Sequence, residues 1–222
     1  MRWILALLLT LGLAHADAPW ADRLARVDAQ LLARPDDPDL LVARASLLRQ
    51  AGQWDAATST LENAGEGAPA RLERGRLHAD RGDVDAALAE LRPLDSAAAW
   101  TLRAQLLEGR DPAASLLAWD GALARRPDPD GHLHRARLAL HIHRPDEALA
   151  GLARGIDALD GAVVLRLERL QIALDADRPV IALEEADALL ALDPRRPGWR
   201  LLRAQALEAL HLDPQPDRQA AL

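Results

Sequence analysis

RASLL, which spans Arg44 to Leu48, is the stretch that decides the fold, because similar stretches recur along the chain. Its copies are RGRLH at Arg74–His78, RAQLL at Arg103–Leu107, RARLA at Arg135–Ala139, RLQIA at Arg169–Ala173 and RAQAL at Arg203–Leu207. The first arginines of successive copies are 30, 29, 32, 34 and 34 residues apart. Self-similarity at such a period indicates stacked repeats, in which each repeat is one supersecondary unit.

Each copy lies in the first of two predicted helices. Apolar residues at helical spacing predict helices over 39–50 and 54–64, joined by a tight turn at Ala51-Gly52. The same pattern predicts pairs over 69–80 and 84–91, 96–108 and 112–125, 130–142 and 146–159, and 161–175 and 179–192. Two helices joined in this way form an antiparallel hairpin. Single helices are predicted over 19–33 and 198–210.

Small, glycine, aromatic and proline residues occupy regular places in these hairpins. The first repeat has Ala45, Gly52, Trp54, Ala57, Ala64 and Pro69, and in this it resembles the tetratricopeptide repeat (TPR) family. The resemblance covers nearly all of the chain after residue 16. It implies an all-α fold, a right-handed superhelical solenoid of antiparallel helix hairpins. Small residues are needed where two helices cross closely, because a larger side chain would hold their axes apart.

The repeats divide the chain into five parts. We expect a signal peptide over 1–16, an N-terminal capping helix over 17–37, about five TPR-like hairpins over 38–195, a C-terminal capping helix over 196–210 and a flexible tail over 211–222. Terminal helices must act as caps, because each hairpin exposes an apolar face that only a neighbour covers. The register of the repeat is least defined at 92–98.

The N-terminus has the pattern of a secretory signal peptide. Arg2 precedes an uncharged apolar run from Trp3 to Leu13, and Ala14-His15-Ala16 follows as a small-x-small cleavage site. The run is shorter than the roughly 20 residues that span a bilayer. We therefore predict cleavage after Ala16, a periplasmic or secreted protein, and no stable membrane insertion after cleavage. An uncleaved interfacial anchor is the alternative.

Charge and composition limit the function. The formal net charge is −7, and an acidic chain repels phosphate backbones, so we expect no nucleic-acid partner. The chain has no Cys, which removes thiol catalysis and cysteine metal sites. No glycine-rich phosphate loop and no Ser/His/Asp set at a suggestive spacing is present. We expect a protein that is not an enzyme and needs no cofactor.

The resemblance implies a concave groove lined by the first helix of each hairpin. Two residues after each repeated arginine, the sequence places a polar line, and neighbouring polar residues extend it. The predicted partner-binding residues are Ser46, Arg49, Arg76, Gln105, His134, Arg137, His141, Gln171 and Gln205. Hydrogen-bonding side chains in a row can hold the backbone of an extended peptide. The predicted function is a protein–protein interaction scaffold or adaptor of the cell envelope, with an unknown peptide or protein partner. An ordinary solvated helix face is the alternative.

Four histidines on or just after one predicted helix form a second candidate site. His132, His134, His141 and His143 would make the protein a carrier of a metal or small ligand. The i,i+4 spacing that lets two imidazoles hold one ion is absent. His134 and His141 lie about 10 Å apart along a helix, from roughly 1.5 Å of rise per residue. Ordinary surface or groove histidines are therefore the preferred interpretation, and a metal site formed by the four is the weaker alternative.

The repeated arginines, Arg44, Arg74, Arg103, Arg135, Arg169 and Arg203, are named the arginine ladder here. No acid lies three or four residues from any of them, so an ion pair within the same helix is excluded. Two interpretations stay open: the arginines join neighbouring helices, or they bind a ligand. For the first, the candidate acids are Glu62, Asp120 and Asp187, and Trp100 with Arg103 and Trp199 with Arg203 are candidate cation–π pairs.

Overall fold

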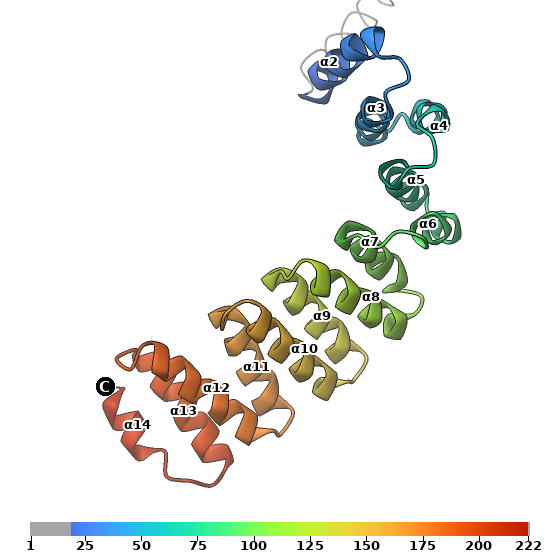
Figure 1. Ribbon diagram of the computed structural model, residues 1–222. Coiled ribbons are helices and arrows are strands. Elements are labelled where there is room, and N and C mark those ends of the chain that lie inside the picture. The colour runs from blue at the N-terminus through green and yellow to red at the C-terminus, as the bar shows by residue number, and fades with distance from the viewer. Residues whose placement is uncertain (1–18, 222) are drawn as a thin grey trace, which may run out of the picture. The chain divides into compact units, whose positions relative to one another are not determined.

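The computed structural model describes residues 19–221, and every regular element in that range is an α-helix (Figure 1). The chain divides into two compact units, with the boundary between Asp95 and Ser96. This boundary lies within 92–98, where the sequence leaves the repeat register least defined. No helix of the described range is long and apolar enough to cross a membrane. The signal peptide predicted for 1–16 lies outside the described residues and stays a prediction.

Among residues 19–221, five helices lie in the first unit and eight in the second. The helices of the first unit are α2 (Pro19–Ala33), α3 (Pro38–Gln50), α4 (Trp54–Asn63), α5 (Ala68–Asp80) and α6 (Val84–Leu91). Those of the second are α7 (Ala97–Leu107), α8 (Pro112–Arg125), α9 (Pro129–His141), α10 (Pro145–Ala158), α11 (Val163–Asp175), α12 (Pro179–Leu192), α13 (Pro197–Ala209) and α14 (Gln215–Ala220). Each predicted helix is present, with ends that agree to within two residues.

Proline and aspartate set where the helices begin. Proline occupies an early position of several helices, where its missing N–H costs no hydrogen bond. Asp111 accepts a hydrogen bond from the backbone N–H of Ala114 at 2.9 Å, and Asp128 accepts one from Gly131 at 2.9 Å. These carboxylates satisfy N–H groups that the helix itself leaves unpaired.

Left-handed residues end the first helix in four of the five hairpins, the exception being the hairpin of α7 and α8. Gly52 has a φ of 72°, whereas His143 and Asp177 have φ values of 57° and 56° at the equivalent turns. The N–H of the residue after each one returns to the helix, as when Arg144 donates to the carbonyl of Ala139 at 2.8 Å. The turn therefore needs the left-handed conformation, which glycine adopts without the steric cost that other residues incur.

Close helix crossings in the first unit are made by small residues, as the repeat pattern predicts. Ala45 of α3 and Ala57 of α4 are both fully buried in one apolar cluster with Leu48 and Leu61. A side chain larger than alanine at either position would have to displace its neighbours.

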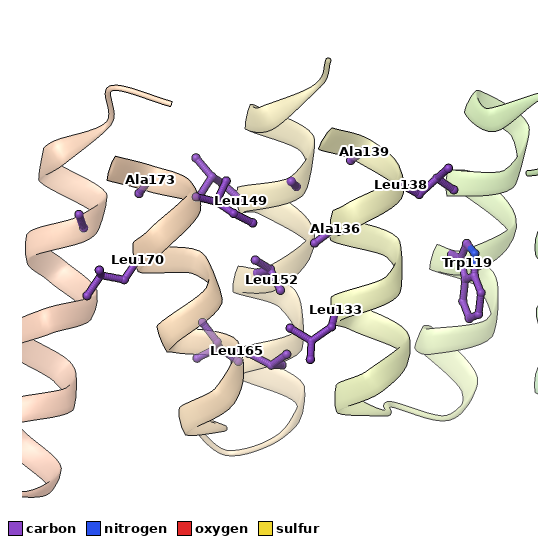
Figure 2. Close-up of a cluster of buried hydrophobic side chains, with 14 of the residues drawn as sticks. Trp119, Leu133, Ala136, Leu138, Ala139, Leu149, Leu152, Leu165, Leu170 and Ala173 are labelled. Carbon is purple, nitrogen blue, oxygen red and sulfur yellow. The ribbon is translucent and has the colours of Figure 1, made fainter. Parts of the chain in front are cut away.

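The second unit has one apolar core that continues from hairpin to hairpin. Figure 2 shows Trp119 of α8, Leu133 and Ala136 of α9, Leu152 of α10 and Leu165 of α11 within a single cluster. Because each hairpin contributes to the core of the next, the helices stabilise one another mainly by stacking.

The C-terminal segment is more ordered than expected. Residues 211–222 were predicted to form a flexible tail, but α14 forms there and packs against α13. The buried carboxylate of Asp217 accepts a hydrogen bond from Arg203 of α13 at 2.6 Å. The helix expected as an unpaired C-terminal cap thus has a short partner helix, which the sequence conceals because its six residues carry no apolar stripe.

Candidate functional site

Arginines of the ladder join neighbouring helices in both units. Arg44 on α3 donates to Asp28 of α2 at 2.8 Å and to the hydroxyl of Thr60 on α4 at 2.6 Å. Arg203 on α13 donates to Asp187 of α12 at 2.5 Å as well as to Asp217. In each case one guanidinium links its own helix to the helices before and after it, which matches the planar, forked geometry of arginine donors.

Arg135 is the most buried of these links. Its side chain is 4% exposed, and it donates from Nε and Nη2 to the two oxygens of Asp120 at 2.6 and 2.9 Å. It also donates to the backbone carbonyl of Glu147 at 2.9 Å. Burial alone would raise the pKa of Asp120, but Arg135 and Arg154 outweigh it and hold the pKa below its ordinary value. Asp120 is therefore ionised at neutral pH and belongs to the fold.

A second arginine, three residues before the ladder position, shares the acid in several repeats. Arg166 and Arg169 both donate to the buried carboxylate of Glu185. Arg71 and Arg74 likewise pair with Glu66. For the buried Glu185, two guanidinium groups satisfy the carboxylate more fully than a single pair would.

The structure favours the structural interpretation of the ladder and changes two details. Asp120 and Asp187 are partners, as predicted, and Arg103 lies over the ring of Trp100 at 4.2 Å. The prediction for Glu62 was wrong, because no ion pair of the described residues includes it. The predicted pair of Trp199 with Arg203 is also not formed: Arg196 covers that ring instead, at 4.8 Å.

In the first unit, the predicted binding residues are used within the protein. Arg49 donates to Glu73 at 2.6 Å and to Asp80 at 2.7 Å, and Arg76 donates to Glu73 at 3.1 Å. Burial lowers the pKa of Arg49, yet hydrogen bonds and attraction from both acids raise it overall. Ser46 is bonded to Gln50. These contacts give Arg49 a structural role.

In the second unit, the predicted binding residues lie on the exposed side of the first helices. We name this set the A-face; its members are Gln105, His134, Arg137, His141, Gln171 and Gln205. The side chains of Gln105, Arg137, His141 and Gln205 have no hydrogen-bond partner among residues 19–221. Gln171 donates to Asp175 at 3.0 Å on its own helix. Most of these polar groups are therefore available to a partner.

A cluster around Trp119 adjoins the A-face. Oε1 of Glu108 accepts a hydrogen bond from the indole Nε1 of Trp119 at 3.3 Å and lies 2.6 Å from Nε2 of His134. The rings of Trp119 and His134 are 4.9 Å apart between centroids. A pocket of about 260 Å³ opens beside them, also lined by Thr101 and Asp130. The sequence alone did not single out Trp119, because its contact with Glu108 and His134 depends on how three helices pack.

The four histidines have separate surroundings. His132 is buried, and neither ring nitrogen has a hydrogen-bond partner of normal geometry. Burial lowers its pKa, although the carbonyl of Gly151 acts in the opposite direction. His134 bonds to Glu108, and His143 occupies the left-handed turn. Within the described part of the chain, no three His, Asp or Glu side chains gather in a way that would hold a metal ion.

Comparison with known proteins rests on solved structures. No family model and no curated protein matches the sequence. The C-terminal part of a TPR repeat-containing protein from Cytophaga hutchinsonii matches with a TM-score of 0.60 and 11% identity, over 91% of this chain and 87% of that one. YrrB, described as a TPR protein with an unusual peptide-binding site, matches with a TM-score of 0.51 and 15% identity, over 84% and 98%. The chain has the helical-hairpin fold of the tetratricopeptide repeat proteins.

Proposed function

We propose that the protein is a non-enzymatic scaffold that binds a peptide or protein segment along the A-face. One contrast carries this proposal. The guanidinium groups of Arg135 and Arg203 are bonded to other helices, whereas Arg137 and Gln205, two positions further along the same helices, have no partner in the described residues. Gln105, on the first helix of the preceding hairpin, has none there either. Polar groups that the fold does not use are the ones that a partner can bind.

The chemistry of the A-face suits an extended segment. Amide side chains both donate and accept hydrogen bonds, so Gln105 and Gln205 can pair with the N–H and C=O groups of a partner backbone. Such main-chain contacts supply affinity, while pockets beside them select side chains. YrrB, which has the same fold, is described as having a peptide-binding site, and this is consistent with the proposal.

The proposed location is the cell envelope. The basic residue, apolar run and small-x-small site in residues 1–16 support export. The acidic net charge of −7 argues against a nucleic-acid partner. The proposal includes no catalytic step and no cofactor.

The test compares two triple variants by crosslinking capture from the native envelope. In the first, Gln105, Arg137 and Gln205 are changed to Ala; in the control, the exposed Asp157, Glu184 and Arg195 are changed to Ala. We expect the first variant to keep its helicity and melting temperature but lose the captured partner, and the control to keep both. If the first variant captured the same partner as the unchanged protein, the A-face would not be the binding surface.

A further inference from the structure

The pocket beside Trp119 differs from three larger cavities of the described residues, whereas a cavity of about 380 Å³ beside Leu140 and Ile172 also has no ladder arginine. Cavities of about 540, 350 and 430 Å³ open next to Arg135, Arg74 and Arg44. Because they recur beside ladder arginines that already bond within the protein, they belong to the repeat architecture. The pocket of about 260 Å³ contains no ladder arginine and lies between α7, α8 and α9, beside the A-face.

The size of this pocket fits one side chain. Pockets for drug-sized ligands measure about 300–1,000 Å³, so 260 Å³ is too small for such a molecule. Its apolar surface comes from Trp119, Ala122 and Leu123, and Thr101 completes one side. The hydrogen bond from Trp119 to Glu108 holds the indole in place before a partner side chain binds. A preformed, rigid aromatic surface reduces the entropy lost on binding.

The charge around the pocket is negative. Asp128 and Asp130 line it and Glu108 adjoins it, whereas Arg126 is the one arginine in its lining. Asp128 caps α9, and Asp130 is exposed with no ion pair in the described range. Two further acids lie on another first helix: Glu168 and Asp175 share a side of α11 with Gln171, by their helical spacing. Arg137 is the only arginine of the A-face.

We infer that the pocket beside Trp119 receives an arginine or lysine side chain of the bound segment. The inference rests on the proposed function and adds the class of partner. The aliphatic part of a basic side chain would pack on Trp119 and Leu123, while its charged end would reach Asp130 and the free oxygen of Glu108. Glu108, Asp128 and Asp130 would repel an acidic segment. The same acids therefore attract basic segments and select against acidic ones.

The experiment follows the indole N–H signals of the purified full chain by NMR during titration with short Gly/Ser peptides. One peptide carries two arginines, and matched peptides carry glutamines or glutamates instead. We expect the arginine peptide to shift the Trp119 signal while the Trp100 and Trp199 signals stay in place. The glutamine and glutamate peptides should leave all three unchanged. If the arginine peptide left Trp119 unmoved, or the glutamate peptide moved it equally, the inference would be overturned.

A pair of charge-matched variants separates the pocket from general attraction. Glu108→Gln with Asp130→Asn should weaken the arginine peptide about threefold to tenfold, as expected for charged contacts at a partly exposed site. Asp157→Asn with Glu184→Gln removes the same charge from second helices and should have no such effect. Equal weakening by both variants would contradict the pocket. Continued capture of an envelope partner by the A-face, independent of these acids, would overturn this inference alone and leave the proposed function standing.

Discussion

Arg135 offers the sharpest test of how the arginine ladder supports the fold. Its side chain is 4% exposed and makes three hydrogen bonds, two to Asp120 and one to the carbonyl of Glu147. Breaking a fully buried ion pair costs about 3–5 kcal/mol. Asp120 is 35% exposed and would still pair with Arg154, which lies 2.7 Å from it. Arg135→Ala should therefore lower the free energy of unfolding by about 3 kcal/mol, at the lower end of that range. Arg135→Met retains the packing of the stem and should cost roughly half as much.

A double-mutant cycle isolates the pair itself. Combining Arg135→Met with Asp120→Asn should show a coupling of about 1–2 kcal/mol, because the two residues share charged hydrogen bonds. The assay is urea unfolding followed by circular dichroism at pH 7, with each variant compared at equal ionic strength. Additive effects, within about 0.3–0.5 kcal/mol, would refute the claim that this pair joins α8 to α9. An Arg135→Ala variant as stable as the unchanged protein would refute it more directly.

Three further predictions concern the histidines and a glycine. Because burial lowers the pKa of His132, this histidine binds a proton more readily in the unfolded chain than in the folded one. The free energy of unfolding should therefore fall as the pH drops below about 6.5. Acid titration followed by fluorescence should show a smaller fall for His132→Leu. Gly155→Ala places a methyl group 2.7 Å from Cγ of His132 and 2.8 Å from Leu165. The free energy of unfolding, measured in urea, should therefore fall by about 1–3 kcal/mol. Adding His132→Ala to this variant should restore much of the lost stability. His143→Gly removes a left-handed residue with a φ of 57° and should stabilise by about 0.5–1 kcal/mol; an unchanged or lower melting temperature would contradict this.

The helices could be predicted from the sequence because their signals are local. Proline at the start of α8, α10 and α12 and glycine at the first turns mark boundaries that depend only on backbone geometry. The ordered α14 was missed because its stability comes from a contact with another helix, between Asp217 and Arg203. Local patterns carry no information about such a contact.

The partners of the ladder were predictable only in part. Asp120 and Asp187 were named because they lie on second helices next to a ladder helix. The structure places both on the helix before their arginine, whereas Glu185 lies sixteen residues after Arg169, on the second helix of the same hairpin. Choosing between these directions requires the register of one helix against another. For the same reason Arg49 looked like a binding residue, although Glu73 and Asp80 occupy its guanidinium.

The central claim is that the ladder stabilises the fold while the A-face binds the partner. The most direct measurement gives melting temperature and crosslinked partner yield for two variants side by side: Arg135→Ala, and the triple change of Gln105, Arg137 and Gln205 to Ala. We expect Arg135→Ala to have a lower melting temperature than the unchanged protein but still to capture the partner when it is folded. We expect the triple variant to have an unchanged melting temperature and to capture no partner. The reverse result, a normal melting temperature and no capture for Arg135→Ala with full capture by the triple variant, would contradict the central claim.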